Sequence, residues 1–140
     1  MWRYNIASNS WTWMKGSNVI AQGTWGIMGV EDPNNTPSGR WSYTRWKDKC
    51  GNLWLFGDNG LDAVGAGGEL NDLWRFNIAT NNWTWMSGIN MVSNTNTGVF
   101  GTRCITSAFN IPPPRAECRT AGPMPTETSG CLEALFLIKC

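Results

Sequence analysis

The chain has 140 residues, a formal net charge of +1, and only 15% charged residues. So small a net charge supplies no basic surface for nucleic acid or an anionic membrane, and we expect neither partner. No stretch approaches the roughly 20 apolar residues of a membrane-spanning helix, and the N-terminus does not have the pattern of a signal peptide.

The composition is typical of an all-β protein. Ten tryptophans and 16 glycines stand beside many asparagines, threonines and serines, which suits aromatic strands joined by tight turns. The five cysteines are unevenly placed and contain no C-x-x-C pair. We therefore predict neither a disulfide framework nor a zinc site.

The first element is a hairpin whose sequence returns later in the chain. Residues 2–16 and 74–88 are identical at eleven of fifteen positions, at an offset of 72 residues. Such long-period similarity predicts an array of like units. We expect residues 1–14 to form a two-stranded hairpin that packs face to face against the second unit through Trp11 and Trp13.

Residues 17–39 follow as a long loop that recurs less closely. The Gly-Ile-Met-Gly of residues 26–29 returns as the Gly-Val-Phe-Gly of residues 98–101. In this alignment Trp25 stands opposite Thr97, so it has no aromatic counterpart. The remaining tryptophans recur at positions that predict core packing, and Trp25 is therefore our candidate for contact with a ligand, such as stacking on a sugar ring.

Four antiparallel strands are expected next. They lie near residues 41–47, 52–57, 72–77 and 83–86. The second of them is apolar on both faces, which predicts a central, buried strand. We expect Trp54 and Trp74 to be largely buried, and we interpret the glycine-rich residues 58–69 as a surface loop.

Chemistry-bearing residues are few. Asp58, Asp62, Glu69 and Asp72 could offer oxygen ligands to calcium, but their spacing fits no calcium loop, and we favour a role in stabilising turns. The sequence contains no histidine, which excludes a histidine base or a Ser-His-Asp triad within this chain. We predict no enzymatic activity, no metal ligand and no cofactor.

Three segments resemble the kelch repeat. They are Gly-Asn-Leu-Trp-Leu-Phe-Gly at 51–57, Asn-Asp-Leu-Trp-Arg-Phe at 71–76 and Asn-Trp-Thr-Trp at 82–85. The resemblance implies incomplete, four-stranded antiparallel blades of a kelch-type β-propeller, although Asp58 replaces the second glycine of the family's pair. Galactose oxidase has this fold, but its copper site needs two histidines, so the resemblance implies the fold and not that activity.

The resemblance divides the chain into five parts. They are residues 1–16 (the second half of a preceding blade), 17–40 (a loop), 41–88 (a complete blade), 89–115 (a second loop) and 116–140 (a tail without the kelch pattern). About one and a half blades leave sheet edges uncovered, because a propeller closes only with several blades. We therefore expect marginal stability and self-association through the exposed edges.

The tail, residues 116–140, is interpreted as the next blade read out of frame. One set of synonymous codons for residues 122–135, read from the last base of codon 121, encodes Trp-Thr-Asp-Ala-Asn-Gly-Asn-Leu-Trp-Leu-Phe-Gly-Gly. That peptide is a kelch strand pair in phase with the repeat. An out-of-frame tail has not been selected to fit the sheet, so we expect it to lack a defined fold.

Three functional hypotheses follow. The first, which we favour, is a binding or scaffold module for a protein or carbohydrate ligand, belonging to a parent protein that is secreted or displayed on the cell surface. The second is a fragment of a galactose-oxidase-like enzyme whose active site lies elsewhere. The third is a non-functional remnant of a frameshifted gene.

Overall fold

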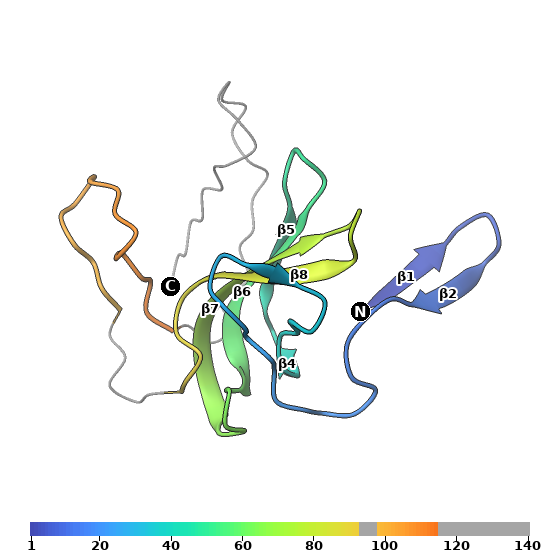
Figure 1. Cartoon of the computed structure of the whole chain (residues 1–140), viewed down its shortest axis with the longest axis horizontal. Helices are drawn as coiled ribbons and strands as arrows, with labels where there is room; N and C mark the ends of the chain where they lie inside the picture. Colours follow the sequence, from blue (N-terminus) through green and yellow to red (C-terminus); the bar gives the residue numbers. More distant parts are fainter. Residues whose placement is uncertain (93–97, 115–140) are drawn as a thin grey trace.

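The computed structural model of the protein describes residues 1–92 and 98–114. Every regular element in these two ranges is a β-strand, so the chain is all-β, as its composition predicts. The strands form a two-stranded hairpin and a six-stranded sheet, here called the main sheet (Figure 1). They are β1 Trp2–Asn5, β2 Ser10–Trp13, β3 Glu31–Asp32, β4 Arg40–Trp41, β5 Thr44–Lys47, β6 Leu53–Leu61, β7 Gly67–Asn77 and β8 Asn82–Ser87. The prediction for residues 116–140 lies outside the described residues.

The main sheet contains the four strands that the sequence predicts. β4 and β5 both pair with β6, β6 pairs with β7, and β7 pairs with β8, all of them antiparallel. The segment expected as one strand over 41–47 is divided, because Ser42 has a φ of 62° and turns the backbone between β4 and β5. A strand that was not predicted, β3, lies within the first long loop and pairs with the outer edge of β8.

The glycine-rich segment 58–69 is not the surface loop that we expected. It extends β6 and β7 into a long hairpin, closed by a turn in which the Asp62 N–H donates to the Ala66 carbonyl at 2.9 Å. A Cβ atom at Gly68 would lie only 2.5 Å from Cγ1 of Val92. The expectation is wrong because glycine here allows a neighbouring segment to approach closely, and does not mark irregular backbone.

The apolar core covers one face of the main sheet and centres on Trp74. Its buried members are Trp25, Leu55, Trp74, Phe76 and Trp83. The Trp74 side chain is 0% exposed, and its ring centroid lies 5.7 Å from that of Trp25 and 6.3 Å from that of Trp83. The predicted burial of Trp74 is confirmed.

Trp54 lies on the other face of β6, where it is only half-buried. Its expected burial is confirmed in part, because Trp54 is less enclosed than Trp74 but is not exposed. Its ring stacks on Trp46 at a centroid distance of 5.7 Å, and its Nε1 donates to Oδ2 of Asp48 at 2.8 Å. A side chain that stacks on one neighbour and bonds to a turn carboxylate stabilises the β5–β6 hairpin without being enclosed.

A buried ion pair ties β4 to β7 across the intervening β6. Arg40 donates from Nη1 and Nη2 to the two carboxylate oxygens of Asp72, at 2.6 and 2.8 Å, and the side chains are 2% and 0% exposed. Asp72 Oδ2 also accepts a hydrogen bond of 2.7 Å from Nε1 of Trp74. This bidentate pair fixes the register of the sheet and orients the tryptophan at the centre of the core.

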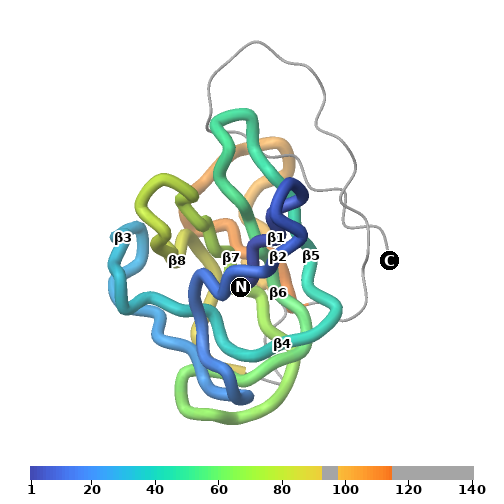
Figure 2. Tube along the Cα trace, turned by 90° about the vertical axis from the view of Figure 1, so that its right-hand side faces the viewer, coloured from blue at the N-terminus to red at the C-terminus, as the bar shows by residue number. Residues whose placement is uncertain are grey.

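The β1–β2 hairpin projects from the main sheet, and Figure 2 views the sheet from the hairpin side. Trp11 and Trp13 are 65% and 49% exposed, so the expected face-to-face packing through these residues is wrong. The hairpin does not extend the main sheet either. The described part of the chain lacks strands beside β1 and β2 of the kind that enclose β7 and β8, and this absence explains the exposure.

Two cysteines lie among the described residues. Cys50, in the turn between β5 and β6, takes part in a disulfide bond. Cys104 is free and exposed. Pairing depends on which thiols the fold brings together, and spacing in the sequence does not show that.

Candidate binding surface

The repeated motif folds β1–β2 and β7–β8 in the same way. In both hairpins, aromatic residues at equivalent positions are cross-strand partners. The pairs are Trp2–Trp13 and Tyr4–Trp11 in the first hairpin, and Trp74–Trp85 and Phe76–Trp83 in the second. Both turns use a left-handed asparagine, Asn9 with a φ of 49° and Asn81 with a φ of 61°. The expectation of similar local structure is confirmed.

Burial separates the two hairpins sharply. The exposed fractions in the first are 61% for Trp2, 43% for Tyr4, 65% for Trp11 and 49% for Trp13. At the equivalent positions of the second, Trp74, Phe76 and Trp83 are 0%, 2% and 8% exposed, and Trp85 is half-buried. The first hairpin therefore presents to solvent the residues that form the core in the second.

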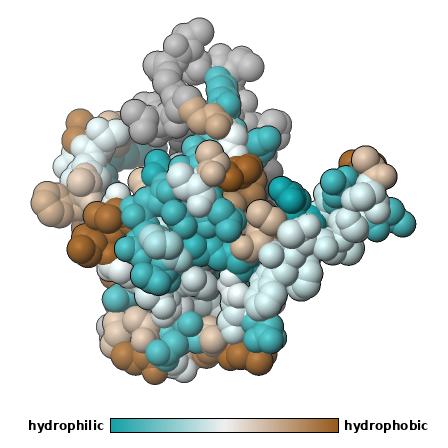
Figure 3. Space-filling view, turned by 45° about the vertical axis from the view of Figure 1, so that its right-hand side comes forward, coloured by the Kyte–Doolittle hydropathy of each residue, from teal (hydrophilic) through white to brown (hydrophobic). Residues whose placement is uncertain are grey.

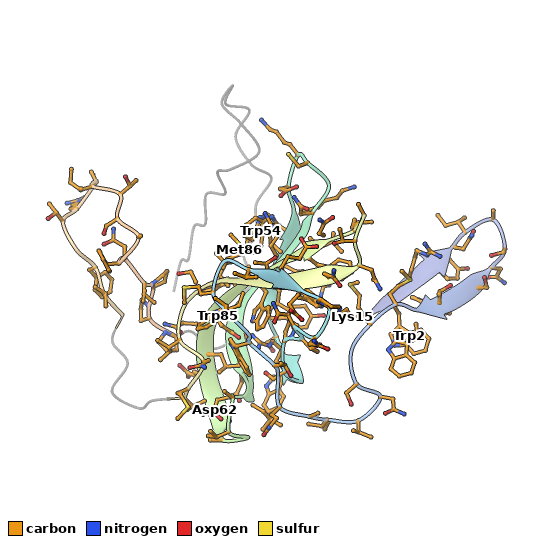
Figure 4. The ribbon with its side chains drawn as sticks, viewed as in Figure 1. Trp2, Lys15, Trp54, Asp62, Trp85 and Met86 are labelled. Carbon is orange, nitrogen blue, oxygen red and sulfur yellow. The ribbon has the colours of Figure 1, made fainter. Side chains whose placement is uncertain are left out.

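These exposed rings form a continuous aromatic surface, which we call the hairpin surface and define as Trp2, Tyr4, Trp11 and Trp13. The Trp2 and Trp13 rings stack with centroids 6.2 Å apart, and those of Tyr4 and Trp11 lie 4.9 Å apart. The hairpin stands out as a separate lobe in Figure 3, and Figure 4 places Trp2 clear of the main sheet. Clustered exposed aromatic rings are characteristic of binding surfaces.

The hairpin is held to the main sheet at its base. Lys15 donates from Nζ to the Pro33 carbonyl at 2.7 Å and to Oδ1 of Asn82 at 3.2 Å (Figure 4). Asn81 Nδ2 donates to the Met14 carbonyl at 3.1 Å. These polar contacts anchor the hairpin while leaving both of its faces accessible.

Residues 98–114 fold as a second copy of residues 23–39, at an offset of 75 residues. Each copy has one isolated bridge and one asparagine that binds a backbone carbonyl. The bridges are Thr24–Thr36 and Val99–Ile111, and the side-chain bonds run from Asn35 Nδ2 to Val30 O at 3.0 Å and from Asn110 Nδ2 to Ile105 O at 3.1 Å. In both copies a glycine lies where a Cβ would be 2.3 Å from Oδ1 of that asparagine, at Gly26 and at Gly101.

This structural offset changes the assessment of Trp25. At 75 residues, Trp25 corresponds to Phe100 and not to Thr97, so it does have an aromatic counterpart. The structure also buries Trp25 to 4% exposure, against the core residue Trp74. This position favours packing over contact with a ligand. Sequence reasoning missed Phe100 because the shorter offset aligned the wrong glycines; the shared Gly-x-aromatic-Gly pattern is the signal that could have found it.

Two acidic residues of segment 58–72 stabilise a turn and an ion pair. Asp62 accepts hydrogen bonds from the backbone N–H groups of Val64 and Ala66, at 2.9 and 2.8 Å. Asp72 is paired with Arg40. Within residues 1–92 and 98–114, no group of three or more potential metal ligands is assembled.

Comparisons with known proteins give no relative. No family model, no curated protein and no solved structure matches the chain. In the part of the chain that the structure describes, no helix has the length and apolar character needed to span a bilayer. Function must therefore be argued from the hairpin surface and the internal repeats.

Proposed function

We propose that the chain is a non-catalytic repeat module of the kelch type, which binds an extended polypeptide by adding strands to the β1–β2 hairpin. One observation carries this proposal. The same fifteen-residue motif is enclosed by neighbouring strands in one copy and exposed in the other. The hairpin surface has the shape and chemistry of a half-filled core.

The enclosed copy indicates what the exposed copy accepts. β7 pairs with β6 so that Leu55 lies opposite Trp74 and Leu53 opposite Phe76. At the equivalent positions of β1 stand Trp2 and Tyr4. Among the described residues, β1 pairs with β2 alone. A strand with alternating large apolar side chains would gain backbone hydrogen bonds along β1 and cover its rings.

A carbohydrate ligand is the second candidate, because exposed tryptophan rings can stack on sugars. The open backbone edge of β1 favours a polypeptide, since main-chain hydrogen bonding along a strand is specific to another strand. The kelch assignment itself is supported by the Gly-Asn-Leu-Trp-Leu-Phe-Gly segment and by the antiparallel order of β5 to β8.

A direct test uses a fluorescent peptide with the sequence of residues 51–61, which contain all of β6. Its anisotropy is followed while the intact chain is titrated in at low concentration. We expect saturable binding that weakens at least about tenfold in the double variant Trp2→Ala/Trp11→Ala, as for central aromatic anchors of interfaces.

The matched control is Trp41→Ala. Trp41 is 64% exposed, similar to Trp2 and Trp11, but it lies in β4 and outside the hairpin. This variant should bind the peptide as the parent chain does. Absence of peptide binding, or saturable binding of oligosaccharides in its place, would overturn the proposal.

A further inference from the structure

We infer that the outer edge of β2 accepts residues 98–114 of a second copy of this chain, so that copies assemble head to tail. The inference rests on the proposed function, because it uses the hairpin as an acceptor of strands. It goes further by naming the partner, the segment that binds and the contacts.

The copy of the repeat that forms the core consists of the loop 23–39 and the β7–β8 hairpin, and we call it the filled copy. It shows how the loop contacts its hairpin. Residues 23–39 wrap the outer edge of β8, where β3 pairs with it. The Gly29 N–H donates to the Trp85 carbonyl at 2.7 Å, and Asn35 Nδ2 donates to the Trp83 carbonyl at 3.1 Å. Trp25 from the same loop packs on Trp74. The loop therefore covers both the backbone edge and the aromatic face of its hairpin.

The equivalent edge of β2 is open. Within residues 1–92 and 98–114, β2 pairs only with β1, and all four of its residues are exposed. Because β1–β2 and β7–β8 share one register, the carbonyls of Trp11 and Trp13 occupy the places of the Trp83 and Trp85 carbonyls. β2 thus presents the acceptors that the loop uses on β8.

The second loop is folded for the same contact, but no named strand of the described residues pairs with it. Asn110 Nδ2 donates a hydrogen bond to the Ile105 carbonyl. The equivalent Asn35 Nδ2 donates two hydrogen bonds, one to the Val30 carbonyl and one to the Trp83 carbonyl in β8. Cys104 stands at the place of Gly29 and has a φ of 64°, close to the 79° of that glycine. Phe100, at the place of Trp25, is 71% exposed.

If residues 98–114 lie on the β1–β2 hairpin of a second copy as residues 23–39 lie on β7–β8, the contacts of the interface follow. Asn110 Nδ2 donates to the Trp11 carbonyl of the second copy, and the Cys104 N–H donates to its Trp13 carbonyl. Phe100 packs on its Trp2. These three contacts bury side chains and backbone groups that are exposed in the single chain.

The two surfaces cannot meet within one chain. Figure 1 shows residues 98–114, in orange, on the side of the main sheet opposite the hairpin, in blue. Each copy therefore offers one donor loop and one acceptor hairpin at opposite ends. Such a heterologous contact produces open chains or closed rings, and not a two-fold dimer.

Charge contributes little to this interface. In the filled copy Glu31 lies 4.0 Å from Arg75, an ion pair across the edge. In the second loop Thr106 takes the place of Glu31, so the equivalent Arg3 gains no carboxylate. Association should therefore depend weakly on salt concentration.

The test is sedimentation of the intact chain and of two variants, with complementation between them. The donor variant is Phe100→Ala/Asn110→Ala, and the acceptor variant is Trp2→Ala/Trp11→Ala. We expect the parent to associate with rising concentration in low and high salt, and each variant alone to be monomeric. An equimolar mixture should stop at a 1:1 complex, because only one functional interface remains.

Controls and a second measurement keep the result clear. Ile20→Ala, at an 87% exposed position outside both surfaces, should associate as the parent does. Cys104 should be protected from a maleimide in the associated parent but not in the donor variant, as read by peptide mass mapping.

Two outcomes would overturn the inference. A donor variant that still associates means that hairpins pair with each other, and peptide binding would then continue to support the proposed function. A parent chain that stays monomeric at all concentrations excludes the second copy as partner. Loss of peptide binding as well would remove the proposed function with it.

Discussion

The β1–β2 and β7–β8 hairpins have almost the same sequence and the same strand register, yet one is exposed and the other forms the core. Local interactions suffice for the hairpin itself, since both copies have the same cross-strand pairs and the same left-handed asparagine in the turn. Burial depends on neighbours, namely β6, β3 and the loop that carries Trp25.

A repeated motif therefore specifies its own shape but not its surroundings. The aromatic pattern is the same in both hairpins and predicts a core in both. The exposed hairpin nevertheless keeps the aromatic residues that form the core in the other copy.

The largest expected effect comes from removing the equivalent tryptophan in each copy. Trp74→Ala should lower the free energy of unfolding by about 4 kcal/mol, because it empties the centre of the core and leaves Asp72 without one donor. Trp2→Ala should cost about 0.5 kcal/mol, as for an exposed site. Urea titration at low protein concentration measures both, and equal losses would show that the hairpin is enclosed in solution.

A smaller contrast is expected at the two glycines that end the motif. Gly16 and Gly88 have φ values of 99° and 90°, so alanine is strained at both. At Gly88 the new Cβ would also lie 2.2 Å from the Asn71 carbonyl oxygen, whereas at Gly16 the nearest atom is 3.5 Å away. We expect a loss of about 3 kcal/mol for Gly88→Ala and about 1 kcal/mol for Gly16→Ala. A matched pair of denaturation curves checks this, and a larger loss at Gly16 would contradict the contrast.

The sequence allows the hairpins and the four main strands to be predicted, because alternation and turn residues are local signals. The predicted surface loop over residues 58–69 is wrong, because the glycine at position 68 permits Val92 to approach and does not break the strand. The sequence also fails for β3, whose two residues Glu31–Asp32 have no strand pattern and pair with β8 only because the loop brings them there.

The candidate site was predicted only in part. The repeat correctly indicates that Trp11 and Trp13 belong to a hairpin, but the sequence predicts that these two side chains pack against the second unit, and the structure exposes them. The second loop could have been recognised, since Gly-Thr-Trp-Gly at 23–26 and Gly-Val-Phe-Gly at 98–101 share a pattern. The hairpin motif repeats after 72 residues and the loop after 75. An alignment that uses one offset throughout therefore misses the similarity of the two loops.

The smallest expected effect is a difference in pH-dependent stability between two turns. In both turns a side-chain oxygen accepts hydrogen bonds from backbone N–H groups. In the β1–β2 turn the neutral Asn5 accepts hydrogen bonds from the backbone N–H groups of Ala7 and Ser8, at 3.0 and 3.2 Å. In the β6–β7 turn the acceptor is the buried carboxylate of Asp62. Only the second contact can titrate.

The pH dependence follows from the pKa of Asp62. Burial alone would raise this pKa, but bonds from backbone N–H groups, first that of Val92 at 3.0 Å, outweigh it and hold the pKa below its usual value. The carboxylate therefore stabilises the fold fully above the unfolded pKa of about 3.9, and this stabilisation is lost as the pH falls through the lower folded value.

We expect Asp62→Asn to cost about 1 kcal/mol near neutral pH, since an amide nitrogen cannot accept from Val92. The variant's unfolding free energy should also fall less steeply below about pH 4. Glu31 and Asp48, whose pKa values are also lowered, are present in both proteins, so the difference between the two pH curves isolates Asp62. Parallel curves in acid would show that this carboxylate gives no pH-dependent stability.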